Sequence, residues 1–112
     1  MILKLNIYNK KNITKTYTTE SYDIMFGTVE DLLNLIDLEK FNNSKNDMEF
    51  IKVVTEAVVK GFDIIKPLLK DIFEGLTDDE LRNTKISEIV NILVSIIKIT
   101  MTQITSGTKT KN

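Results

Sequence analysis

The stretch from Gly61 to Val90 constrains the fold more than any other part of the chain, because it marks where helices end and begin. Its sharpest signal is Thr77 followed three residues later by Glu80, with a leucine on either side of the pair. Threonine at the N-cap and glutamate at N3 form a capping box, and the two leucines occupy the hydrophobic-staple positions. Gly75, just before this box, is typical of a helix end. We therefore expect one helix to end near Gly75 and another to begin at Thr77.

The only proline of the chain leaves two arrangements open for the preceding segment. Gly61 stands where a helix could end, and Asp63 could cap the next one. From that cap, Pro67 falls just past the first helical turn, where its ring and missing N–H destabilise a helix. Either a helix begins near Pro67 or one long helix bends there, and we favour a break or bend between Gly61 and Pro67. The apolar residues of this segment recur at helical spacing: Ile64, Ile65, Leu68, Leu69, Ile72 and Phe73.

The N-terminal residues predict a β-hairpin. Leu3, Leu5 and Ile7 alternate with polar residues, which is the period of a half-buried strand. Residues 9–12 (NKKN) suit a turn, and the β-branched run of residues 13–18 suits a second strand. An isolated hairpin is marginally stable in water, so we expect this one to lie on the helices or to pair with another chain.

Two further helices are expected between the hairpin and Gly61. Thr28 is positioned to cap the first, with Asp31 at N3. Its apolar stripe would comprise Val29, Leu32, Leu33, Ile36 and Phe41. Asn46 is positioned to cap the second, with Glu49 three residues on. The predicted fold class is α+β, mainly α, with an N-terminal β-hairpin followed by a bundle of four to five helices.

The final segment, Lys85 to Ile104, is the most apolar, and its two apolar faces allow two interpretations. It is either a central core helix packed on two sides or a surface for self-association or for a partner. On the second interpretation, the candidate partner-binding residues are Ile89, Ile92, Leu93, Ile96 and Ile99. We expect residues 1–105 to form a single domain and the small polar residues 106–112 to be a disordered tail.

Composition excludes most chemistry. The chain has 112 residues, no His, no Cys, a net charge of −1 and a single arginine, Arg82. A thiol nucleophile, a His-assisted hydrolase and a His/Cys metal centre are therefore excluded. The acidic run Asp78–Glu80 fits a helix N-terminus better than a metal site. A helix-turn-helix over residues 77–98 would put Ile and Val where base-reading side chains belong. We expect no enzyme activity, no metal, no cofactor, no nucleic-acid partner and no membrane span.

The order of several segments carries a family resemblance. A short K-L-N-I-Y strand comes first, followed by Tyr22–Asp37 (YDIMFGTVEDLLNLID) and Phe62–Lys85 (FDIIKPLLKDIFEGLTDDELRNTK), and then by an Ile/Val-rich helix. The most specific part is K-P-L-L-K-D-I-F-x-G-L-T-D-x-E-L. Taken together, nearly the whole chain resembles the tail assembly chaperones of long, non-contractile-tailed phages and prophages of low-GC Gram-positive bacteria.

This resemblance implies a function without catalysis. Such chaperones bind the long, helical, aggregation-prone tape measure protein, keep it soluble and help to recruit tail tube subunits. They act in the cytoplasm of the bacterial host and are absent from the finished virion. The resemblance therefore implies two partners, the tape measure protein and the tail tube protein, and surplus apolar surface adds an expected homo-oligomer. The alternative is a small helical protein–protein interaction adaptor of a bacterial host.

Overall fold

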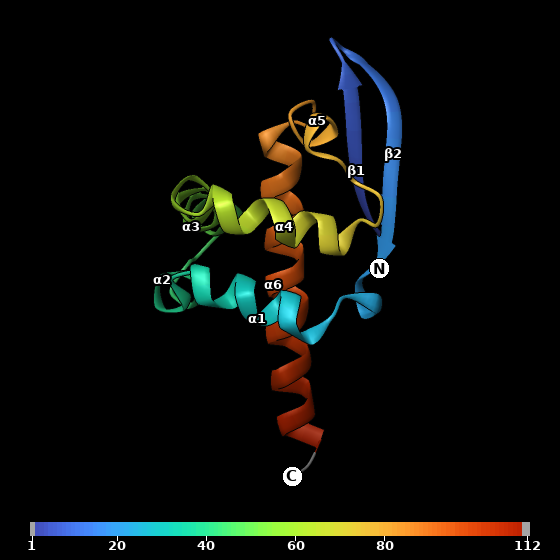
Figure 1. Ribbon diagram of the computed structural model, residues 1–112. Helices are drawn as coiled ribbons and strands as arrows, with labels where there is room; N and C mark the ends of the chain where they lie inside the picture. Colours follow the sequence, from blue (N-terminus) through green and yellow to red (C-terminus); the bar gives the residue numbers. More distant parts are fainter. Residues whose placement is uncertain (1, 111–112) are drawn as a thin grey trace.

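A computed structural model describes the backbone of residues 2–110 (Figure 1). A two-stranded hairpin is followed in this range by a short 3-10 helix, Ser21–Asp23, and six α-helices. The elements are β1 (Ile2–Asn9), β2 (Asn12–Glu20), α1 (Phe26–Leu35), α2 (Leu38–Asn42), α3 (Asp47–Lys60), α4 (Phe62–Ile72), α5 (Asp78–Leu81) and α6 (Ile86–Thr110). The predicted fold class, α+β and mainly α, is confirmed.

The hairpin is antiparallel and lies on the helices. Leu3, Leu5 and Ile7 of β1 are buried, together with Tyr17 of β2, while the remaining residues of the hairpin are exposed or half-buried. The backbone N–H of Tyr8 donates to the carbonyl of Asn83 (2.8 Å), so the loop before α6 covers part of the outer edge of β1. The alternation predicted for β1 is confirmed, because Leu3, Leu5 and Ile7 all lie on the buried face of the strand.

Helix α6 is the axis of the molecule. Figure 1 shows it running through the middle, with the hairpin beside its upper end and α1 and α4 crossing it in this view. It contacts α3, α1 and β1, and residues on several of its faces are buried. A helix that is apolar around most of its circumference needs cover on more than one side, and these three elements supply that cover.

The first predicted helix is divided into two, and its expected cap is wrong. Helix α1 begins at Phe26 after an N-cap at Met25, so Thr28 lies inside the helix, where it is 6% exposed. Glycine inside a helix costs only about 1 kcal/mol, so Gly27 does not stop a helix that packing stabilises. The stripe is interrupted after Leu35, because Asp37 caps α2 by accepting from the N–H of Lys40 (3.1 Å). This division accounts for six helices where four to five were expected.

The break between α3 and α4 falls at Gly61, within the predicted interval, and Pro67 lies inside α4. The N-cap of α4 is Gly61, so the prediction of an Asp63 cap is wrong. A Cβ at Gly61 would lie 2.9 Å from Cδ2 of Leu35, so the missing side chain lets the end of α1 pack against this junction. Pro67 has no N–H to donate to the carbonyl of Asp63, and both residues are exposed, so this carbonyl lies on the solvent-facing side of α4.

The two predicted polar caps are confirmed. The side chain of Asn46 accepts from the N–H of Glu49 (3.0 Å) at the start of α3. Thr77 and Glu80 form the expected capping box at α5. Gly75 lies three residues after α4 and has a φ of +89°, which a residue with a side chain rarely adopts, so it shapes the turn into α5.

The C-terminal helix extends further than expected. The backbone of residues 106–110 continues α6, so the predicted disordered tail is helical up to Thr110, and residues 111 and 112 lie outside the described residues. Once a helix has formed, each added residue contributes another backbone hydrogen bond, so a polar composition does not by itself end it. Within residues 2–110, no helix is long and apolar enough to cross a membrane.

Candidate partner-binding hollow

The candidate residues on the final helix lie mostly in the core. Exposed fractions are 9% for Ile89, 5% for Ile92, 0% for Leu93 and 3% for Ile96, while Ile99 is half-buried. The chain's own elements cover these side chains, because α6 is the central helix. Four of the five are therefore buried in this conformation, as the core-helix interpretation expects, and one of these four, Ile89, also lines the hollow described next.

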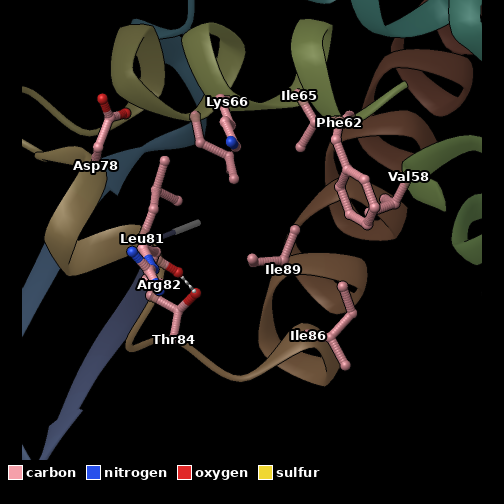
Figure 2. A pocket seen from close by; sticks show the side chains of 11 residues that line it. Val58, Phe62, Ile65, Lys66, Asp78, Leu81, Arg82, Thr84, Ile86 and Ile89 are labelled. Carbon is pink, nitrogen blue, oxygen red and sulfur yellow. Dashed lines mark hydrogen bonds between the residues drawn. The ribbon is translucent and has the colours of Figure 1, made fainter. Parts of the chain in front are cut away.

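Exposed apolar surface is found instead at the N-terminal end of α6. A hollow of about 350 Å³ lies between α4, α5 and the start of α6 (Figure 2). Its apolar lining is Val58, Phe62, Ile65, Leu69, Leu81, Ile86 and Ile89, and its polar lining is Lys66, Asp78, Arg82 and Thr84. Below, "the hollow" means this set of residues. Its volume falls within the range of about 300–1,000 Å³ that is typical of binding pockets.

Helical spacing brings the lining residues to one place. Helix α4 contributes positions 62, 65, 66 and 69, which lie on one face at i, i+3, i+4 and i+7. Helix α6 contributes positions 86 and 89 in the same way. Phe62 is 49% exposed and Ile86 is 52% exposed, so two large apolar side chains meet solvent here. The hollow is thus a concave apolar surface walled by helices.

The short helix α5 is fixed to the hairpin through Glu80. One carboxylate oxygen accepts from the Tyr17 hydroxyl (2.5 Å), and the other lies 3.3 Å from the ammonium of Lys15. The Thr77 N–H also donates to Glu80 (3.1 Å). The hydrogen bond from Tyr17, followed by those from Thr77 and Lys15, lowers the pKa of the Glu80 carboxyl to about 2, although desolvation opposes them. These contacts position one wall of the hollow.

A second apolar concavity lies beside α1. It measures about 570 Å³, and its lining consists of Ile24, Phe26, Val29, Glu30, Leu33 and Asn34 together with Thr100 of α6. Phe26 is 79% exposed. In this concavity only α1 and the segment leading into it contribute more than one residue, whereas three helices, α4, α5 and α6, each contribute two or more residues to the hollow. We therefore take the hollow as the candidate site.

Sequence reasoning missed Phe62, Ile86, Lys66 and Arg82 as site residues. The apolar double row expected in this segment begins at Ile64, which is 45% exposed and does not line the hollow. A helical projection of α4 from Phe62 places residues 62, 65 and 69 on one face, and that signal was present in the sequence. The contribution of α5 and α6 to the same surface depends on tertiary packing.

The lining offers binding and little chemistry. Its one hydroxyl, on Thr84, donates to the carbonyl of Leu81 (2.8 Å), and the Asp78 carboxylate is paired with Lys70. In residues 2–110 no group of three or more acidic, His or Cys side chains is placed to hold a metal ion. Comparison of the chain with protein-family models, curated proteins and solved structures finds no match.

Proposed function

We propose that this protein is a tail assembly chaperone of a long, non-contractile-tailed phage or prophage of low-GC Gram-positive bacteria. It binds the tape measure protein through the hollow, keeps that protein soluble and helps to recruit tail tube subunits. It acts without catalysis in the cytoplasm of the bacterial host, as a homo-oligomer, and is absent from the finished virion.

The observation that supports this proposal is the exposed apolar hollow. The hydroxyl and the carboxylate in its lining, on Thr84 and Asp78, are already bound to other groups, so the hollow is suited to binding. Amphipathic helices bind to other proteins by placing their apolar face in such grooves. A long helical protein awaiting assembly presents apolar faces of this kind, and covering them prevents aggregation. The similarity of Lys66–Leu81 to the family's pattern adds an independent argument, because this run provides much of α4 and all of α5.

The test is co-expression with fragments of the tape measure protein encoded beside this chain. Wild-type protein is expected to raise the fraction of the fragment that stays in the supernatant. The double variant Phe62→Ser/Ile86→Ser is expected to lose this effect, because it removes the two most exposed apolar side chains of the hollow. Soluble fragment is measured by quantitative gel, and retained folding by circular dichroism.

Ile64→Ser is the matched control. Ile64 lies on the same helix, is 45% exposed and does not line the hollow, so its loss is expected to leave solubilisation unchanged. A wild-type chain that leaves fragment solubility unaltered would contradict the chaperone function. If Ile64→Ser lost as much solubilisation of the fragment as the double variant, the binding surface would lie outside the hollow.

A further inference from the structure

The hollow has two chemically different sides. Figure 2 shows Phe62, Ile86 and Ile89 along one side and Lys66 and Arg82 along the other. Within the part of the chain that the structure describes, neither Lys66 nor Arg82 forms an ion pair. The hollow therefore presents an apolar wall opposite the two positive charges of Lys66 and Arg82, with Asp78 as the one acidic side chain of the lining.

Three carboxylates near the hollow have partners outside its lining. Asp78 lies 2.5 Å from the ammonium of Lys70, whose hydrogen bond and charge lower the pKa of the Asp78 carboxyl, and the charge of Lys66 adds a smaller lowering. Glu80 accepts from the hairpin, as described above. Glu88 accepts from the backbone N–H of Asn6 (3.1 Å) and from the Tyr8 hydroxyl, so its carboxylate is held at β1. The lining therefore holds two cationic side chains, Lys66 and Arg82, against the single carboxylate of Asp78, and this excess of positive charge favours an anionic ligand.

We propose that the hollow binds an amphipathic helix whose apolar stripe is bordered on one edge by Asp or Glu residues. This inference rests on the proposed function and names the class of segment that the chaperone recognises. Lining residues at helical spacing fit a helix, and Lys66 with Arg82 fit an acidic edge. The C-terminal end of the chain's own α6 does not fit, because residues 102–110 contain no Asp or Glu.

Two labelled synthetic peptides test the inference by fluorescence anisotropy. Both carry the same stripe of leucines on a helical repeat, and one has Glu where the other has Lys along one edge. Wild-type protein is expected to bind the Glu-edged peptide roughly three- to tenfold more tightly, since exposed ion pairs contribute modestly. The preference is expected to shrink as salt is raised, because exposed charges are screened.

The variant Lys66→Glu/Arg82→Glu is expected to reverse the preference. The control Lys11→Glu/Lys52→Glu changes net charge equally at two exposed lysines that do not line the hollow, and it is expected to keep the wild-type preference. Equal affinity of wild-type protein for both peptides, or the same preference in both variants, would overturn the inference. Peptide affinity that weakens as protein concentration rises would identify a second copy as the occupant and overturn it too.

The outcomes separate this inference from the proposed function. If wild-type protein solubilises the tape measure fragment but shows no preference for the acidic edge, the chaperone function stands and the inference fails. If the preference is present but no fragment is solubilised, the chemistry of the hollow stands and the chaperone function fails.

Discussion

Among single residues, Glu80 links local and tertiary structure most directly. Its carboxylate completes the capping box with Thr77 and also binds Tyr17 and Lys15 of the hairpin. The first of these roles is local, and the spacing of the two capping residues predicts it. The second depends on where the hairpin lies, and no pattern within the sequence indicates it.

The depressed pKa of Glu80 predicts how its contribution depends on pH. Because the folded-state pKa is about 2 and the ordinary value is 4.5, the carboxylate stabilises the fold fully above about pH 4.5. That stabilisation is lost as the pH falls towards about 2. Glu80→Gln is therefore expected to be less stable than wild type at pH 7, by a deficit that shrinks between pH 4.5 and 2.

Urea unfolding at several pH values between 7 and 2 measures this deficit. Glu74→Gln, at an exposed position shortly before the cap, is the control for removing a negative charge. Its difference from wild type is expected to be small by comparison at every pH. A deficit of Glu80→Gln that stays constant down to pH 2 would rule out the proposed role of the carboxylate.

The elements show which sequence signals are reliable. Caps made by a side chain and a nearby backbone N–H, as at Asn46 and Thr77, could be predicted because both partners are local. The cap expected at Thr28 failed because burial of that residue inside α1 outweighed its capping preference. In the same way, periodicity predicts that α6 is a helix with two apolar faces. Which of those faces is covered depends on α3, α1 and β1.

The central position of α6 predicts that its apolar residues stabilise the fold. Leu93→Ala is expected to lower the free energy of unfolding by roughly 2–5 kcal/mol, since Leu93 is fully buried and its truncation leaves a cavity. Ile99→Ala, on the same helix but half-buried, is expected to cost less. Chemical denaturation measures both changes. A Leu93→Ala protein of wild-type stability that no longer solubilised the tape measure fragment would assign this residue to partner binding instead.

For the whole molecule, the hairpin and the helices share one core. Leu5 and Leu93 are both fully buried in the same cluster, and the hairpin is also joined to α5 and α6 by polar contacts. An isolated hairpin would be marginally stable, so its order depends on the helices beneath it. We therefore expect residues 2–101 to unfold as one cooperative unit, which is the behaviour predicted from the sequence for a single domain.

The chain carries its own probes for this expectation. Its three tyrosines, Tyr8, Tyr17 and Tyr22, all lie near the N-terminus and there is no tryptophan, so intrinsic fluorescence reports the hairpin region while far-UV circular dichroism reports the helices. The two signals are expected to change at the same urea concentration. Leu5→Ala in β1 is expected to shift both midpoints together, because its loss destabilises the shared core. A fluorescence transition that precedes the loss of helix, or a Leu5→Ala shift confined to fluorescence, would show that the hairpin unfolds separately and that the single-domain prediction is wrong.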